Sequence, residues 1–217
     1  MSVNSSLTQP QVILLHGLLR SKYSMAYLGS ALSRAGFKVF NFGYRSRKYS
    51  IAHHAEVLCE FASHRVERSV PLHFVTHSLG SLVVRTFAHN YSSEFSLGRA
   101  VMLGPPNQGS QFARKVGFFS GIRSFMGPSF EEICNLQIPI GSDCLEIGII
   151  AGGVSHEKGI SPFIDGDDDG VVSVQETKLP GAKDTIILKS MHSVMMYSST
   201  VIEQTIYFLQ NGIFRRK

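Results

Sequence analysis

The chain has 217 residues, long enough for one compact domain with a buried core. Hydrophobic residues make up 43% and charged residues 17%, a balance that excludes an intrinsically disordered chain. The formal charge of +5 leaves anionic partners open. We expect no nucleic-acid partner, because no segment interleaves aromatic with basic residues. No apolar run has the length of a transmembrane segment. Two basic clusters, at 45–48 and 215–217, either allow weak contact with a membrane surface or form a solvated face and tail.

The N-terminus and the cysteines bear on the cellular compartment. Residues 1–9 are polar and lack the apolar stretch of a secretory signal. The chain has three cysteines and no CxxC pair, which is typical of free thiols in a reducing compartment. We therefore expect a cytoplasmic protein with a flexible N-terminus at 1–9 and a single domain at 10–217. The sequence leaves the oligomeric state open.

Short apolar runs alternate with amphipathic patterns along the chain. Strands are expected where apolar and β-branched residues cluster, at 12–15, 38–42, 72–76, 99–103, 146–151 and 185–189. Helices are expected where apolar residues recur every three or four positions, at 25–32, 51–62 and 82–90. A last helix should begin at a capping box of Thr200 and Glu203 and end at Gly212. This alternation predicts an α/β fold, a mostly parallel sheet with helices on both faces.

The stretch 104–144 follows no regular pattern and is rich in Gly, Pro and Phe. We expect it to cover the carboxyl edge of the sheet, where open α/β sheets bind their ligands. Its Phe-rich segment 117–130 has two interpretations. The side chains of Phe118, Phe119, Phe125, Met126 and Phe130 either line a substrate site or belong to the core.

Ser78 stands at a junction between an expected strand and an expected helix. A nucleophile at such a junction sits on a strained turn that needs small neighbours. Gly80 meets this need, whereas Thr76 occupies a position where the usual pattern has Gly. Ser78 is therefore a candidate nucleophile, and the alternative is that it only caps the helix.

A serine nucleophile can attack an acyl group, and such a reaction needs two main-chain amides that stabilise the developing oxyanion. One should come from Leu79, which follows the candidate nucleophile. The other should come from Leu18, in the loop after the first expected strand, where Gly17 allows close backbone approach. On its own, the His16-Gly17 pair is equally compatible with a simple turn.

The aspartate run 165–169 has three interpretations. The segment 165–176 satisfies the spacing of a calcium-binding loop. Such a loop needs flanking helices, whereas the sequence predicts a loop followed by a strand. One of the aspartates could instead be the acid of a catalytic triad, and the run could also be a solvated acidic turn. The calcium loop is the least favoured of the three, so we expect no metal ion and no cofactor, and the other two interpretations remain open at this point.

The candidate base follows from chain order. Where a nucleophile stands on a tight turn between a strand and a helix (a nucleophile elbow), the triad follows the chain order nucleophile, acid, histidine. After the aspartate run the chain contains one histidine, His192, in a loop between the last strand and the last helix. The alternative is a hydrogen-bonded structural histidine. We expect His77, next to the candidate nucleophile, to turn its side chain away from Ser78 and to have a packing role.

Together these segments resemble the bacterial lipase- and esterase-like α/β-hydrolases, from about residue 10 to the end. The ordered motifs are VILLHG at 12–17, THSLG at 76–80, LGPPNQGS at 103–110, DGVVSV at 169–174 and Met191-His192. The resemblance implies the α/β-hydrolase fold with a minimal lid. It also implies that Asp169, which directly precedes Gly-Val, is the acid.

The resemblance further implies a serine carboxylester hydrolase that works through Ser78, His192, Asp169 and an acyl-enzyme intermediate. Its substrate would be a small-molecule or lipid-like ester. Two alternatives remain. An acyltransferase would use the same triad with an acceptor other than water, and a non-catalytic binding protein would use the fold alone.

Overall fold

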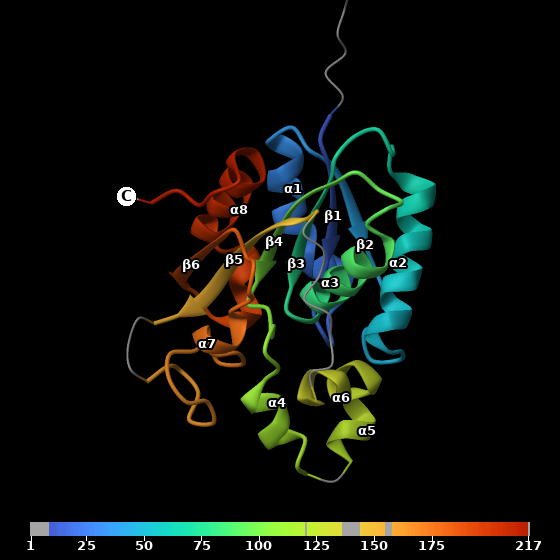
Figure 1. Ribbon diagram of the computed structural model, residues 1–217. Helices are drawn as coiled ribbons and strands as arrows, with labels where there is room; N and C mark the ends of the chain where they lie inside the picture. The colour runs from blue at the N-terminus through green and yellow to red at the C-terminus, as the bar shows by residue number, and fades with distance from the viewer. Residues whose placement is uncertain (1–8, 120, 136–143, 155–157, 217) are drawn as a thin grey trace, which may run out of the picture.

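The computed structural model describes residues 9–119, 121–135, 144–154 and 158–216. Its centre is one six-stranded sheet in the order β2-β1-β3-β4-β5-β6, and every neighbouring pair is parallel (Figure 1). The strands are β1 (Gln11–Leu15), β2 (Lys38–Phe42), β3 (Leu72–His77), β4 (Leu97–Leu103), β5 (Glu146–Gly153) and β6 (Asp184–Lys189). The expected α/β fold with a parallel sheet is confirmed.

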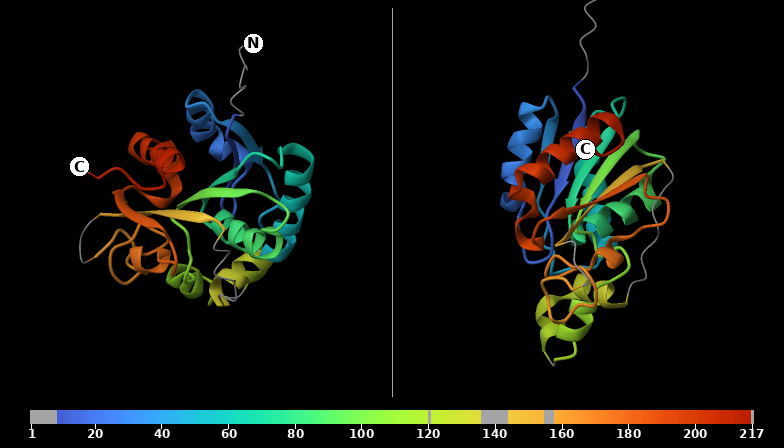
Figure 2. Two further views of the ribbon diagram at one scale, coloured as in Figure 1. Left: turned by 45° about the horizontal axis from the view of Figure 1, so that its top comes forward. Right: turned by 90° about the vertical axis from the view of Figure 1, so that its left-hand side faces the viewer.

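Helices cover both faces of this sheet (Figure 2). On one face lie α1 (Ala26–Arg34) and α8 (Ser199–Asn211), and on the other lie α2 (Ile51–Arg65) and α3 (Leu79–Tyr91). The central strands β1 and β3 are buried along their whole length, which explains why their sequences are continuous apolar runs. None of the described helices is long and apolar enough to cross a membrane.

Short helices gather where the strands end (Figure 1). They are α4 (Gln111–Val116), α5 (Ile122–Met126), α6 (Pro128–Asn135) and α7 (Val174–Thr177). The described part of 104–144 therefore lies at the carboxyl edge of the sheet, as expected. Residues 1–8, most of the N-terminus expected to be flexible, lie outside the described residues.

Two local expectations were wrong. The last helix begins at Ser199, and its cap is Ser198, whose hydroxyl accepts the amide of Val201. The capping box lies elsewhere, where Ser173 and Glu176 bond to each other's main chain and start α7. The residues after Asp169 thus turn into a short helix instead of the expected strand, because the box satisfies the amides of a first helical turn.

Candidate active site

Ser78 occupies a strained turn between β3 and α3. Its φ of 51° and ψ of −118° lie in a region that non-glycine residues rarely adopt. Its side chain makes no capping hydrogen bond to α3, so capping does not explain the residue. Such strain persists where the surrounding structure imposes it, typically at functional sites. The turn presents the Ser78 hydroxyl at the carboxyl edge of the sheet.

The neighbours of Ser78 have the sizes that this turn requires. A Cβ atom on Gly80 would lie 2.9 Å from the Leu15 main-chain oxygen, so a larger residue would push α3 away from β1. Thr76 fits where the usual pattern has Gly because its hydroxyl bonds to that of Ser81, 2.8 Å away. Thr76 therefore does not disturb the turn.

The loop after β1 packs directly on the elbow. A Cβ atom on Gly17 would lie 2.8 Å from Nδ1 of His77 and 3.2 Å from Cβ of Ser78. Glycine is what allows this approach, and Leu18 follows it into the same cavity that Ser78 lines. Leu79 is the first residue of α3. The role of the Leu18 and Leu79 amides in binding an oxyanion stays a prediction.

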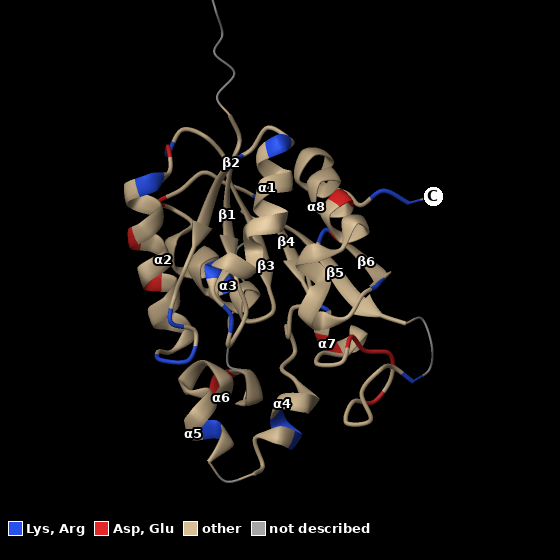
Figure 3. Cartoon of the chain, turned by 180° about the vertical axis from the view of Figure 1, so that it is seen from behind, with Lys and Arg blue, Asp and Glu red and all other residues tan. Residues whose placement is uncertain are grey.

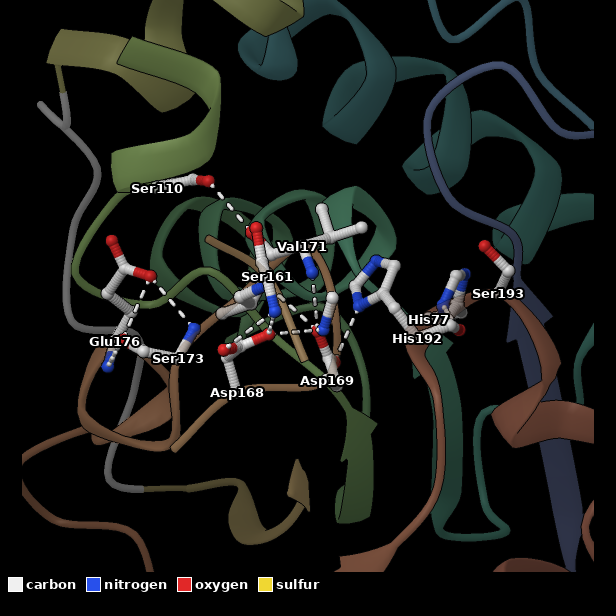
Figure 4. A network of polar contacts seen from close by, with 12 residues as sticks. His77, Ser110, Ser161, Asp168, Asp169, Val171, Ser173, Glu176, His192 and Ser193 are labelled. Atoms are coloured by element: carbon white, nitrogen blue, oxygen red, sulfur yellow. Dashed lines mark hydrogen bonds and ion pairs between the residues drawn. The ribbon is translucent and has the colours of Figure 1, made fainter. Parts of the chain in front are cut away.

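Asp169 and His192 form a buried pair (Figure 4). Oδ2 of Asp169 lies 2.7 Å from Nδ1 of His192. Oδ1 accepts the amides of Val171 at 3.0 Å and Val172 at 2.8 Å, so the carboxylate is held in one orientation. The amide of His192 also donates to the main-chain oxygen of Asp169 at 2.9 Å. Because the Asp169 carboxylate accepts a hydrogen bond from Nδ1–H of His192, the other ring nitrogen, Nε2, carries the lone pair and can accept a proton.

The neighbouring carboxylates of Asp167 and Asp168 accept hydrogen bonds from main-chain amides. Asp167 accepts the amide of Val154 at 2.7 Å, and Asp168 accepts the amides of Ser161 at 3.0 Å and Gly170 at 2.6 Å. Within the described ranges, no group of three His, Cys, Asp or Glu side chains is arranged to hold a metal ion. Independence from calcium stays a prediction, which a chelator would test.

His77 does more than the packing that the sequence suggested. Its Nε2 lies 2.9 Å from the main-chain oxygen of His192, and the two rings are 4.7 Å apart between centroids. Burial, and next the nearby His192, hold the pKa of His77 well below its ordinary value of 6.5. The ring is therefore neutral, and Nε2–H donates to the carbonyl. No signal in the sequence beyond its place beside Ser78 points to this bond.

Ser78 and His192 line one cavity of about 280 Å³. Its wall is mostly apolar and includes Pro106, Phe112, Ala113, Ile133, Val171 and Val172. The Phe-rich segment fits its two interpretations only in part, because three of its side chains are exposed and belong neither to this cavity nor to the core. Met126 and Phe130 line the cavity, whereas Phe118, Phe119 and Phe125 are 88%, 66% and 60% exposed. A larger hollow of about 750 Å³ lies beside β2, but it contains neither Ser78 nor His192.

No protein-family model matches the chain, and no curated protein matches it. Solved structures do. A lipase of Bacillus licheniformis in its mature form superposes with a TM-score of 0.65 at 17% identity, over 87% of this chain and 86% of that one. A metagenomic carboxyl esterase superposes with a TM-score of 0.66 at 18% identity, over 88% of this chain and 66% of that one. Polyneuridine aldehyde esterase superposes with a TM-score of 0.62 at 12% identity, over 94% of this chain and 100% of that one.

At these identities the likeness concerns the fold. It extends over most of the chain and agrees with the parallel six-stranded sheet and the helices between its strands. The chain therefore has the α/β-hydrolase fold.

Proposed function

We propose that the protein is a serine carboxylester hydrolase. One observation carries the proposal: a serine on a strained turn and a histidine bonded to a buried aspartate line the same apolar cavity. The fold shared with esterases and lipases supports a hydrolase. The presence of a serine, a buried aspartate and a histidine in the chain order of a catalytic triad argues against a purely binding protein.

In the proposed mechanism, Oγ of Ser78 attacks the ester carbonyl while Nε2 of His192 takes its proton. Asp169 holds the imidazole in the required tautomer and stabilises the imidazolium. The amides of Leu18 and Leu79 stabilise the oxyanion. His192 then returns the proton to the leaving alkoxide as the acyl C–O bond breaks. Water, deprotonated by His192, attacks the acyl-enzyme and releases the carboxylic acid.

An acyltransferase would share every step except the last, in which an alcohol replaces water. Product analysis with added alcohol distinguishes the two reactions. A hydrolase releases mainly free acid at moderate alcohol concentration, whereas a transferase releases mainly the new ester.

The test is covalent labelling with a fluorophosphonate probe together with hydrolysis of p-nitrophenyl esters. We expect the wild-type protein to be labelled on the peptide that contains Ser78, and Ser78→Ala to lose both labelling and hydrolysis. The control is Ser92→Ala at the far end of α3, which should be labelled like the wild type. Labelling of Ser78→Ala at the wild-type rate would contradict the proposal.

A further inference from the structure

A second groove, of about 520 Å³, opens next to the active-site cavity. Leu19 and Arg20 line both hollows, so the groove adjoins the cavity that Ser78 and His192 line. Its other side is formed by the loop 44–48, which follows β2, and by Ser124 and Phe125 of α5. A substrate bound at Ser78 would reach this groove by passing Leu19 and Arg20.

The groove is strongly cationic. Arg20, Arg45, Arg47 and Lys48 line it, and none of the described residues around it is Asp or Glu. In the part of the chain that the structure describes, all ion pairs involve other residues. Arg45, Arg47 and Lys48 belong to the loop that leads into α2, which carries blue segments in Figure 3 at the same end of the molecule as α5 and α6. Among the described residues, no carboxylate pairs with the cations of the groove.

The nearest carboxylates on the adjoining helices have other partners. Glu132 accepts the amide of Ile51 at 2.7 Å, and Glu131 pairs with Arg123 at 2.7 Å. Neither residue lines the groove. The acidic side chains of α6 therefore leave the cations of the groove available for a ligand.

The basic loop is held in place on two sides. The hydroxyl of Ser46 accepts the amide of Leu19 at 3.2 Å, which ties the loop to the segment that follows Leu18. Ser129 donates to the main-chain oxygen of Tyr49 at 2.8 Å. The Arg47 guanidinium lies 4.2 Å from the centroid of the Phe125 ring. These contacts fix the main chain of the loop and the Arg47 side chain next to the active site.

We propose that this groove binds a phosphate group on the alcohol part of the substrate. The inference rests on the proposed function. The apolar cavity suits an acyl chain, so the anionic group must belong to the alcohol. The planar guanidinium groups of Arg45 and Arg47 match phosphate oxygens, and Lys48 adds a point charge. The substrate class is thus an acyl ester of a phosphorylated alcohol. Water cleaves its acyl C–O bond, the alkoxide leaves with the proton from His192, and the phosphate ester stays intact.

The test compares two soluble esters that differ by one group, 1-octanoylglycerol and 1-octanoylglycerol 3-phosphate, both below their aggregation concentrations. We expect wild-type kcat/KM to be roughly tenfold or more higher for the phosphorylated ester, as charge-assisted hydrogen bonds to phosphate imply. High salt should reduce this ratio because exposed charges are screened. Free glycerol 3-phosphate should inhibit competitively if the phosphate alone is recognised. A preference seen only above the aggregation concentration would indicate a lipid surface instead and overturn the inference.

Variants locate the effect. Arg45→Gln, Arg47→Gln and Lys48→Gln should each lower the ratio, and the triple variant should bring it close to one. The matched control is Arg34→Gln, an exposed cation at the end of α1 near the opposite edge of the sheet, which should keep the wild-type ratio. If the thermal transition shows that the triple variant does not fold, the single variants Arg45→Gln and Lys48→Gln replace it. The inference then requires that each of them lowers the ratio of kcat/KM for the two esters.

The failure of this inference differs from the failure of the proposed function. Equal kcat/KM for both esters in a wild-type enzyme that the fluorophosphonate labels would overturn the phosphate groove alone. A wild-type protein that neither hydrolyses an ester nor takes the label would overturn the proposed function. A preference that persists in the triple variant would also overturn the groove.

Discussion

The His77 ring donates a hydrogen bond from Nε2 to the main-chain oxygen of His192, 2.9 Å away. A carbonyl can only accept, so the proton is on Nε2, and Nδ1 keeps its lone pair. Nδ1 is buried without a hydrogen-bond partner and faces Gly17. One neutral ring thus joins the loop after β1, the elbow and the loop that carries His192. We interpret His77 as a positioning residue for the proposed base.

We expect His77→Ala to lower kcat by roughly ten- to a hundredfold with little change in KM, because a misplaced base slows the chemical step more than binding. His77→Gln should restore part of kcat, since its amide can donate to the same carbonyl. Steady-state kinetics on both variants checks this. Fluorophosphonate labelling should persist, more slowly. If kcat of His77→Ala equals that of the wild type, the positioning role is wrong.

Asp169→Asn should lower kcat by about 10³- to 10⁴-fold while the protein stays folded, since an amide no longer fixes the required tautomer of His192. Asp168→Asn should act differently. The Asp168 carboxylate is buried and bonds to the amides of Ser161 and Gly170. Its variant should lose about 1–3 kcal/mol of unfolding free energy. Denaturant unfolding and kcat, measured on both variants, separate the two roles. A more severe loss of kcat in Asp168→Asn would reverse the assignment.

The volume of the apolar cavity predicts a preferred acyl length. Because the cavity measures only about 280 Å³, we expect acyl chains of medium length to be preferred over long ones. Ala113→Leu adds about three methylenes to the wall and should shorten the preferred chain by about three carbons. A series of p-nitrophenyl esters from acetate to palmitate measures the profile. Ala52→Leu, on an exposed position of α2, is the control and should leave the profile unchanged.

Much of the fold could be predicted because burial on both faces of the sheet leaves continuous apolar runs in the sequence. The short helix α7 could not be predicted. The alternating apolar residues of 171–174 match a strand, whereas the capping box of Ser173 and Glu176 starts a helix. The pairing of Asp169 with His192 was accessible from chain order together with the family resemblance.

Side-chain direction at the elbow was not accessible from the sequence. The positive φ of Ser78 changes how the preceding residue is oriented, so spacing alone cannot place the His77 ring. The cationic groove was equally hidden. Arg20 and the basic residues 45–48 are far apart in the sequence, and they meet because β1 and β2 are neighbours whose carboxyl ends lie at the same edge.

Four buried histidines predict how stability depends on pH. Burial is the largest cause that lowers the pKa of His16 and His77, and it lowers the pKa of His54 and of His73 to about 4. The unfolded chain takes up these protons around the ordinary value of 6.5, whereas the folded protein does so only at lower pH. Since the unfolded state then binds more protons, the free energy of unfolding should fall as pH drops from about 6.5 towards 4.

The melting temperature, measured from pH 7.5 to 4.5, should therefore decrease steadily below pH 6.5. His73→Gln isolates one contribution. Nδ1 of His73 accepts the Arg99 amide at 2.9 Å, and the carbonyl of Gln can replace it without binding a proton. Between pH 7.5 and 4.5, the melting temperature of this variant should decrease by less than that of the wild type, whatever its value at pH 7.5. The control is His89→Gln, on an exposed position of α3, which should follow the wild-type curve. A wild-type melting temperature that stays constant down to pH 4.5 would show that the buried histidines are not neutral in the folded protein.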